Sequence, residues 1–195
     1  MYYVDTSVLI SYIFASEAAQ ETTREILEDQ AKRHGLYASP LTLIETCNTI
    51  CRKVIAERKW KLIDPLQLIL PPNPPKHTES QKDPEETCRF LQSLIINFLK
   101  ENLGMKFIDD EELYTPTPAS LNDITIPKIF KKTIDLSHKL RIRVKDLLHL
   151  TYALMLKRKY NIKYFLTRDI EDFGRVKETA KQLLHIEIIL VKQNK

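Results

Sequence analysis

Short β-prone segments alternate with longer helical segments along most of this chain of 195 residues. The β-prone segments are rich in apolar, aromatic and β-branched residues, and they lie at 2–4, 36–38, 105–108, 163–167 and 185–191. Between them, apolar residues recur at helical spacing, as they do over three turns from position 43 to position 55. Such an alternation is typical of a parallel sheet with helices on both faces. It therefore predicts an α/β fold of three layers around a central parallel sheet.

The length of the chain allows one domain that carries an insertion. A chain of 195 residues can bury one α/β core, and it is too short for two ordinary domains. Residues 60–83 combine polar residues with prolines in the manner of a surface linker: Pro65, Pro71, Pro72, Pro74 and Pro75. We therefore expect a single domain over residues 1–195, with an insertion over 60–103 that consists of this Pro-rich linker and one helix. A second Pro-containing loop is expected over 115–127.

The helix of the expected insertion has an apolar face that something must cover. Its apolar residues follow Pro84 at helical spacing: Leu91, Leu94, Ile95, Phe98 and Leu99. An exposed apolar stripe of this kind favours association. We expect the stripe to pack on the domain or on a second subunit, and we expect the protein to form a homodimer.

Glycine content and net charge narrow the classes of function. The chain has three glycines, at positions 35, 104 and 174, so it contains neither a Gly-rich dinucleotide loop nor a phosphate-binding P-loop. The formal net charge is +4, a mild excess that permits a phosphate-rich partner without requiring one. These properties exclude nucleotide-cofactor enzymes of those types and leave nucleic-acid chemistry open.

The cysteines and the apolar segments predict a cytoplasmic location. The odd number of cysteines, Cys47, Cys51 and Cys88, does not form a closed disulfide framework, and their spacing is not that of a zinc site. Cys47 and Cys51 lie four apart on the apolar face of an expected helix, where a thiol behaves as a small hydrophobe. An acid occurs at position 5, before a signal-peptide stretch could develop, and there is no apolar run long enough to span a membrane. We therefore expect reduced thiols without chemistry, no secretion and no membrane span.

Three acidic residues occupy informative places in the expected fold. Asp5 and Asp169 each follow an expected strand within one or two residues. They should therefore lie beyond the carboxyl ends of the strands, where the active groups of parallel sheets gather. Glu45 lies on the polar stripe of the helix that starts near position 39.

A fourth acid, Asp146, stands within an apolar helix. Apolar residues surround it on nearly the whole circumference of that helix, so its carboxylate should lie close to packed surface. A charge in such a place requires a partner or a metal ion. An Arg partner is the main alternative to a metal, although we expect the neighbouring Arg143 and Lys145 to point elsewhere on the helix.

The other acids also have ordinary structural explanations. Asp5 and Asp169 precede helices, where a carboxylate caps free N–H groups and meets the positive end of the helix dipole. Glu45 fits a capping box that begins at Thr42. However, Ser39-Pro40 already marks a helix start, and that start would place Glu45 too far inside the helix to cap it.

A cluster of carboxylates favours a divalent cation among them. Carboxylates repel one another, and their pKa values rise unless a cation lies between them. Ligation by oxygen atoms alone selects hard ions such as Mg²⁺ or Mn²⁺ over zinc or copper. Such ions serve phosphodiester chemistry, because they activate a water molecule and stabilise charge on the attacked phosphate and the leaving oxygen.

Four motifs around these acids stand in a fixed order. They read YVDTS at 3–7, SPLTLIE at 39–45, KDLLHLTYA at 145–153 and LTRD at 166–169. In this order the sequence resembles the PIN domain family, and within it the VapC-type toxins of toxin–antitoxin pairs. The similarity covers about residues 1–58 and 104–191. Each motif alone is common, whereas four in the expected order form a specific signal.

The resemblance implies an activity as well as a fold. It implies a PIN-like α/β/α fold and cleavage of single-stranded RNA at a Mg²⁺ or Mn²⁺ site, whose catalytic and metal-binding acids are Asp5, Glu45, Asp146 and Asp169. Thr6 and Thr167 would each stand beside a carboxylate. Asp172 is a further candidate ligand, although its spacing from Asp169 is one residue longer than the common form of the motif. A toxin role implies an antitoxin protein as partner.

Basic residues near the acids predict a path for RNA. The candidates are Arg52, Arg143, Lys145 and Arg168. Solvated surface is the alternative interpretation, and Arg52 could equally pair with an acid. His149 lies one helical turn after Asp146, but no second His stands at ligand spacing. We therefore expect a packed or hydrogen-bonded His149 that is not part of the site.

Three classes of function compete at this stage. The first is a metal-dependent ribonuclease, either a toxin or an enzyme of RNA maturation. The second is a catalytically silent PIN-like scaffold, which predicts lost acids, whereas all four are present. The third, a phosphotransferase of the haloacid dehalogenase type, requires a second Asp two residues after the first, and position 7 is Ser. The sequence therefore favours the ribonuclease.

Overall fold

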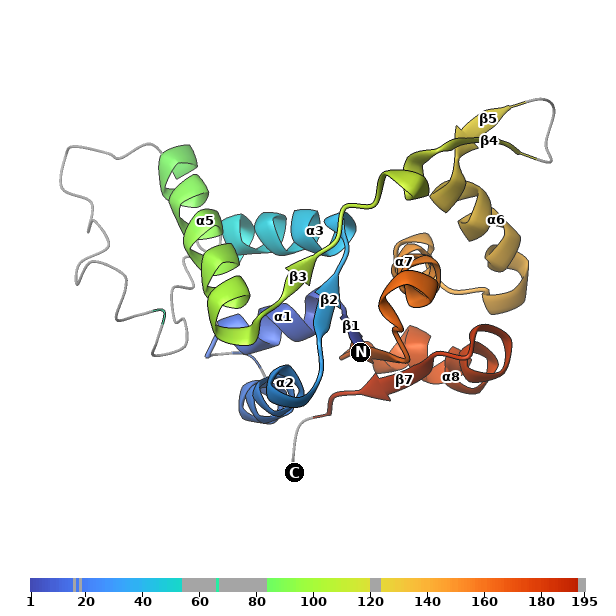
Figure 1. The fold of residues 1–195 in the computed structure, drawn as a ribbon. Helices are drawn as coiled ribbons and strands as arrows, with labels where there is room; N and C mark the ends of the chain where they lie inside the picture. Colours follow the sequence, from blue (N-terminus) through green and yellow to red (C-terminus); the bar gives the residue numbers. More distant parts are fainter. Residues whose placement is uncertain (16, 18, 54–65, 67–83, 120–123, 193–195) are drawn as a thin grey trace.

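The computed structural model of the protein describes residues 1–15, 17, 19–53, 66, 84–119 and 124–192 (Figure 1). Within these residues a five-stranded sheet has the order β3-β2-β1-β6-β7. Its strands are β1 (Tyr2–Val4), β2 (Leu36–Ala38), β3 (Lys106–Phe107), β6 (Tyr164–Thr167) and β7 (Glu187–Leu190). Every neighbouring pair is parallel. The parallel sheet predicted from the alternating pattern is confirmed.

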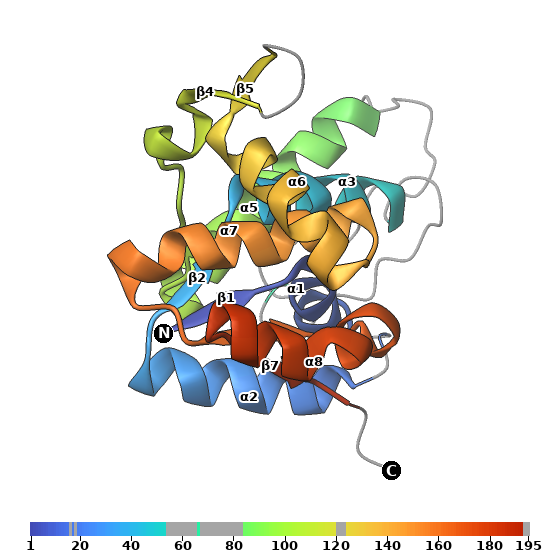
Figure 2. The ribbon, with the colours of Figure 1, turned by 90° about the vertical axis from the view of Figure 1, so that its right-hand side faces the viewer.

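Helices cover both faces of this sheet. One layer holds α1 (Thr6–Ile13), α2 (Gln20–Arg33), α3 (Pro40–Cys51) and α5 (Pro84–Leu103). The other holds α6 (Lys128–Leu140), α7 (Val144–Tyr160) and α8 (Ile170–Leu184). The two groups of helices lie on opposite sides of the strands, and Figure 2 shows α6, α7 and α8 together on the near side. The chain therefore has the predicted three-layer α/β/α architecture.

Alternating side chains of the strands build two separate cores. Tyr2 and Val4 belong to the core under α1, α2, α3 and α5, whereas Tyr3 belongs to the core under α6, α7 and α8. On β6 the same alternation sends Phe165 and Leu166 to opposite faces. Because successive strand residues point to opposite faces, two apolar layers can form only if almost every strand residue is apolar. That requirement explains why the strands read as continuous apolar runs.

The apolar stripe of α5 is covered by the domain itself. Leu91, Ile95, Phe98 and Leu99 are buried in the core that α5 shares with α1, α2 and α3, and Leu94 packs against that core. Of the two alternatives for this stripe, packing on the domain is therefore correct. The Pro-rich part of the expected insertion, and with it most of residues 60–83, lies outside the described residues, so the domain boundaries stay a prediction.

A disulfide joins Cys51, the last residue of α3, to Cys88 on α5. Their Cα atoms lie 5.3 Å apart, which is within the range of disulfides. The expectation that the cysteines have no chemistry is therefore wrong for this pair, whereas Cys47 is free. Counting cysteines could not reveal the pair, because the contact depends on how α5 packs across α3.

The expected loop over 115–127 contains regular structure. A 3₁₀ turn, η2 (Glu111–Tyr114), precedes β4 (Pro116–Pro118), which pairs antiparallel with β5 (Thr125–Pro127). The prolines indicated a loop because proline cannot donate to a strand ladder, yet proline is tolerated in an edge strand. In this two-stranded ribbon Pro116 is paired with Pro127, and both strands are edges. No helix among the described residues is long and apolar enough to cross a membrane.

Candidate metal centre

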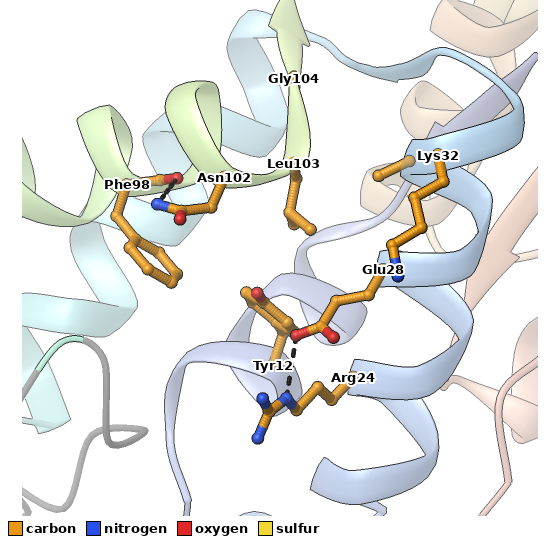
Figure 3. Close-up of a pocket in the computed structure, with 9 residues that line it drawn as sticks. Tyr12, Arg24, Glu28, Lys32, Phe98, Asn102, Leu103 and Gly104 are labelled. Carbon is orange, nitrogen blue, oxygen red and sulfur yellow. Dashed lines mark hydrogen bonds and ion pairs between the residues drawn. The ribbon is translucent and has the colours of Figure 1, made fainter.

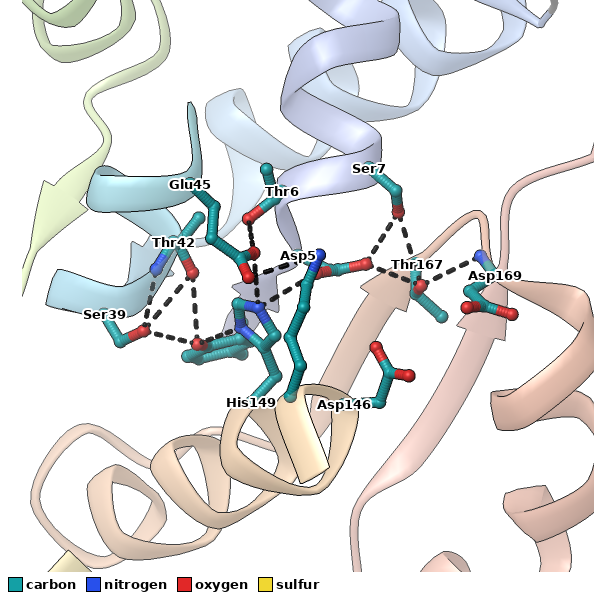
Figure 4. A network of polar contacts seen from close by, with 12 residues as sticks. Asp5, Thr6, Ser7, Ser39, Thr42, Glu45, Asp146, His149, Thr167 and Asp169 are labelled. Atoms are coloured by element: carbon teal, nitrogen blue, oxygen red, sulfur yellow. Dashed lines mark hydrogen bonds and ion pairs between the residues drawn. The ribbon is translucent and has the colours of Figure 1, made fainter. Parts of the chain in front are cut away.

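Asp5 stands at the carboxyl end of the central strand. Its backbone N–H donates to the carbonyl of Leu166 on the neighbouring β6, so β1 and β6 end side by side. Its side chain does not cap α1. Instead, Asp5 Oδ2 accepts hydrogen bonds from Ser7 Oγ at 2.6 Å and from Thr167 Oγ1 at 2.8 Å (Figure 4). The capping explanation therefore does not account for this carboxylate, which is buried at the edge of the sheet.

Glu45 faces Asp5 from α3. The hydroxyl of Ser39 caps that helix by accepting from Thr42 N, so Glu45 lies too far inside the helix to cap it. Its Oε2 accepts a hydrogen bond from Thr6 Oγ1 at 2.7 Å and lies 2.9 Å from His149 Nε2. Burial acts to raise the pKa of Glu45, but these two hydrogen bonds and the charges of His149 and Lys145 hold that pKa at about 2. Glu45 is therefore ionised at neutral pH.

His149 connects this carboxylate to the core of the sheet. Its side chain is fully buried, with Nε2 3.6 Å from Asp5 Oδ1 and Nδ1 3.0 Å from the hydroxyl of Tyr3. An ionised Glu45 only accepts hydrogen bonds, so His149 Nε2 carries a proton and donates to it. The prediction of a hydrogen-bonded His149 is confirmed, and the structure places its ring against Glu45 and Asp5, two acids from which we expected it to be separate. The available signal was its position three residues after Asp146, on the same helical face.

Three further acids converge beside the first group. One carboxylate oxygen each from Asp146, Asp169 and Asp172 lies within 4.8 Å of the other two. Asp169 caps α8, since its Oδ1 accepts from Asp172 N at 3.0 Å, and for Asp169 the ordinary explanation therefore holds as well. Asp172 is buried in the first turn of that helix. The spacing between Asp169 and Asp172 is one residue longer than in the common form of the motif. Their carboxylates still meet, because Asp172 is the third residue of α8 and lies on the same side of the helix as the cap residue Asp169.

Arg143, which we expected to point elsewhere on the helix, pairs with Asp146. Its Nε lies 2.9 Å from Asp146 Oδ2, and its guanidinium also pairs with Asp169 and Asp172. The expectation that Arg143 points away from Asp146 is therefore wrong. Arg143 is the residue before α7, with φ −55° and ψ 143°, so its side chain does not follow the helical lattice on which that expectation rested. Lys145 does point away from Asp146, and it pairs with Glu45 at 3.2 Å.

The group of Asp146, Asp169 and Asp172 remains short of positive charge despite its contacts with Arg143. Burial raises the pKa of Asp146 to about 6, and the neighbouring Asp172 and Asp169 add to the rise, although the Arg143 charge opposes it. For Asp172, burial acts in the same direction, but pairing with Arg143 and Arg175 leaves the pKa lowered. A raised pKa at Asp146 indicates carboxylates that would gain from a further cation.

Acidic and basic side chains share one cleft of about 420 Å³. Asp5, Asp146 and Asp169 line it, together with all four predicted basic residues: Arg52, Arg143, Lys145 and Arg168. In Figure 4, Asp146 points from α7 toward the ends of β1 and β6. The structure therefore brings the acids from all four motifs together, because Glu45 joins the cleft through its contacts with Thr6 and Lys145.

The donor atoms form two groups of different chemistry. Asp5, Glu45 and His149 offer two oxygens and one nitrogen, whereas the three other acids offer oxygens alone, and in each group the atoms lie within 4.8 Å of one another. Oxygen ligands on opposite sides of a Mg²⁺ ion are about 4.2 Å apart. Shifts of a few tenths of an ångström would therefore allow an ion to be held in either group. The residues present fit a hard divalent cation.

A second cleft, between α1, α2 and α5, differs in character (Figure 3). Arg24 and Glu28 form an ion pair at its wall, and the ring of Tyr12 stacks on Phe98. Burial raises the pKa of Tyr12 to about 12, so its hydroxyl stays neutral. Among the residues that line this cleft, Glu28 is the one carboxylate, so the described part of the chain offers no metal-binding group here.

Comparisons with known proteins agree with this architecture. The family model of the PIN domain matches residues 2–179. The fold is similar to a chain in the crystal structure of VapBC2 from Rickettsia felis bound to a DNA fragment from their promoter, with a TM-score of 0.50, 13% sequence identity and coverage of 97% of both chains. At that identity the likeness concerns the fold alone. A search of curated proteins gave no match. Because the family model spans most of its length, this chain belongs to the PIN domain family.

Proposed function

We propose that the protein is a Mg²⁺- or Mn²⁺-dependent endoribonuclease that cleaves single-stranded RNA. PIN domains are generally nucleases, and the observation that carries the proposal is the pair of metal-compatible donor groups at one cleft. The proposed metal-binding and catalytic acids are Asp5, Glu45, Asp146 and Asp169, with Asp172 as a further ligand. A bound ion at these acids would supply an activated water and stabilisation of charge on the attacked phosphate.

The surrounding residues hold the carboxylates in fixed orientations. Ser7 and Thr167 both donate to Oδ2 of Asp5, so Oδ1 faces the cleft side that Glu45 and His149 share. Thr6 fixes Oε2 of Glu45 at 2.7 Å. A carboxylate held by donated hydrogen bonds keeps its charge and loses little freedom when it binds a cation. Thr6 and Thr167 each donate to a carboxylate, and we propose that they position these two acids.

Cations around the acids favour a polyanionic substrate. Arg52, Lys145 and Arg168 line the same cleft as Asp5 and Asp146. Basic side chains at the rim of an acidic centre can hold the phosphates that flank the cleaved bond. We propose that these residues, with Arg143, contact the RNA backbone.

We propose that this nuclease is the toxin of a toxin–antitoxin pair and that an antitoxin protein binds it. We also propose that it acts in the cytoplasm as a homodimer. The VapBC2 structure with a similar fold supports this role. Growth arrest on expression of the parent chain, relieved by a co-expressed protein from an adjacent reading frame, is the expected result. Cleavage of RNA without growth arrest would instead favour an enzyme of RNA maturation.

The decisive experiment removes one charge from the metal centre. Asp5→Asn keeps the shape of the side chain, and we expect cleavage of single-stranded RNA to fall by at least about 100-fold, because metal binding weakens. EDTA should abolish parental cleavage, and added Mg²⁺ or Mn²⁺ should restore it. Asp135→Asn, the same change at an exposed position on α6, is the control and should cleave like the parent. Parental activity that persists in EDTA, or a fully active Asp5→Asn, would leave the scaffold interpretation in place of the nuclease.

A further inference from the structure

The acidic group formed by Asp146, Asp169 and Asp172, here called the acidic triad, already holds a cation of the protein. The single guanidinium of Arg143 contacts all three of its carboxylates. Its Nε faces both Asp146 and Asp172, while a terminal nitrogen reaches Asp169. One positively charged group therefore stands at the point where a metal ion would meet the same three acids.

We propose that Arg143 is a built-in counter-cation of the acidic triad, and that a divalent metal ion enters the triad by displacing its guanidinium. This inference rests on the proposed function, because it assumes that the triad takes a metal ion. It adds that metal affinity is set by a competition between the ion and a side chain of the protein.

The exposure of the four side chains favours such an exchange. The side chain of Arg143 is 63% exposed, whereas those of Asp146, Asp169 and Asp172 are 8%, 21% and 4% exposed. The guanidinium therefore covers the triad from the solvent side. Asp146 and Asp172 beneath it belong to the first turns of α7 and α8, and Asp169 is the cap residue of α8. Arg143 can leave by rotation of its own side chain, while the acids stay in place.

The position of Arg143 on the backbone supports the same role. It is the cap residue of α7, a position that Ser, Thr, Asp or Asn usually fill, and its side chain makes no capping hydrogen bond. A cation at the start of a helix is unfavourable toward the helix dipole. The carboxylates of the triad offset this cost. The charge of Arg143 therefore stabilises the triad and does not stabilise the start of the helix.

The charge balance explains why a counter-cation is required. Three carboxylates within 4.8 Å of one another repel strongly unless positive charge lies among them. Arg is charged at every relevant pH, and its planar group can contact several carboxylates at once. A divalent ion carries twice that charge at a single point. It should therefore replace the guanidinium once its concentration is sufficient.

Binding of Mn²⁺ to metal-free protein tests the competition, with titration calorimetry as the readout. Arg143→Gln removes the competitor, and we expect it to bind Mn²⁺ at least about tenfold more tightly than the parent. Arg143→Lys keeps the charge without the planar contact and should lie between them. Arg175→Gln is the matched control, because Arg175 also pairs with Asp172 and its loss changes the net charge equally. The control should differ from the parent by less than about threefold.

Each outcome separates the alternatives. Unchanged or weaker Mn²⁺ binding by Arg143→Gln would overturn the competition, and so would an equal gain in Arg143→Gln and Arg175→Gln, which would indicate a general effect of charge. A parent that binds no Mn²⁺ and cleaves RNA in EDTA would instead refute the proposed function itself. Binding of Mn²⁺ by the parent with no gain in Arg143→Gln leaves the proposed function intact.

A second measurement follows the guanidinium of Arg143 directly by NMR while the parent protein is titrated with Mg²⁺. The Nε–H signal of Arg143 can be assigned in a ¹H–¹⁵N spectrum by its absence from Arg143→Gln. In the metal-free parent it should be shifted by its carboxylate partners and slow to exchange with water. During titration with diamagnetic Mg²⁺ this signal should move toward the chemical shift of a solvated Arg. The midpoint of that movement should equal the midpoint of Mg²⁺ binding. A signal that stays unchanged at saturating Mg²⁺ would show that the guanidinium does not leave.

Discussion

Thr167 Oγ1 donates a hydrogen bond to Asp5 Oδ2 across 2.8 Å, although the two residues are 162 positions apart in the chain. The bond joins the ends of the adjacent strands β1 and β6 and is buried. The same hydroxyl accepts from Asp169 N at 3.1 Å. Thr167 therefore links the acid of the first motif to the backbone of the last.

Replacement of Thr167 by Val should weaken both the site and the fold. The variant keeps the shape of the side chain but removes one of the two hydroxyl donors to Asp5. We expect RNA cleavage to fall about tenfold and the free energy of unfolding to fall by about 1–2 kcal/mol, because a buried acceptor loses a donor. Single-turnover cleavage and urea denaturation measure the two effects. Thr117→Val in β4 is the control, and an equal loss in both variants would argue against a specific role.

Loss of His149 should change the titration of Glu45. The pKa of Glu45 is about 2, below its ordinary 4.5, because hydrogen bonds led by that of His149 outweigh burial. This group therefore contributes stability above pH 4.5 that is lost as the pH falls toward 2. In metal-free His149→Gln we expect the Glu45 pKa to rise toward 4.5. A pH titration of the ¹³C chemical shift of the Glu45 carboxyl carbon measures this pKa. An unchanged midpoint would mean that Thr6 and Lys145 suffice.

Asp146 should make the metal-free protein less stable at neutral pH than in mild acid. Its pKa is about 6 in the folded protein, above the ordinary 3.8, chiefly because of burial. The protonated carboxyl thus contributes stability below pH 3.8, and that contribution is lost as the pH rises through about 6. Asp146→Asn mimics the protonated form at every pH. In EDTA it should unfold at higher urea than the parent at pH 7.5, with a smaller difference at pH 4.5. A variant less stable than the parent at pH 7.5 contradicts this sign.

Arg52 and Arg168 should each contribute one phosphate contact. Both line the cleft beside Asp5. With uncleaved RNA on the Asp5→Asn background, each Ala variant should bind more weakly and should reduce the slope of log affinity against log salt by about 0.7. Lys131→Ala on α6 removes the same charge away from the cleft and serves as control. If all three variants have equal slopes, the cleft is not the path of the RNA.

The disulfide between Cys51 and Cys88 should stabilise the packing of α5 under oxidising conditions. The two residues are 37 positions apart, and closing a loop of that length restricts the unfolded chain by about 4 kcal/mol in the chain-entropy account. Dithiothreitol should therefore lower the melting temperature of the parent. It should leave Cys51→Ser unchanged, while Cys47→Ser responds as the parent does. Two reactive thiols lost on oxidation confirm the pair, and three free thiols in oxidised protein exclude it.

The fold was predictable because its signals are local. The residues that form β1 and β2 read as β-prone from their own composition, and the parallel sheet follows from helices between the strands. The ribbon of β4 and β5 was not predictable, since prolines at 116, 118 and 127 indicate a loop and pairing is decided by the partner strand. The disulfide was not predictable either, because it depends on the tertiary contact between α3 and α5.

The convergence of the acids was also predictable, whereas their side-chain partners were not. Asp5 and Asp169 follow strands that point to one edge, so their placement required only the sheet. The contacts of Arg143 depend on a backbone that leaves the helical lattice just before α7. The role of His149 depends on Tyr3, a strand residue 146 positions away. Side-chain partners of this kind are set by tertiary packing, to which periodicity along one element is insensitive.

The order of the strands also governs when the acids can meet during synthesis. β1 lies at the centre of the sheet, yet one of its two neighbours, β6, ends only at Thr167. A nascent chain on the ribosome that has not yet emerged to that point leaves one edge of β1 unpaired and presents neither Asp169 nor Asp172. Since such long-range pairings form late, nearly the whole chain must emerge before the acids meet. Under the proposed function, a growing polypeptide would therefore be silent toward the messenger RNA that encodes it.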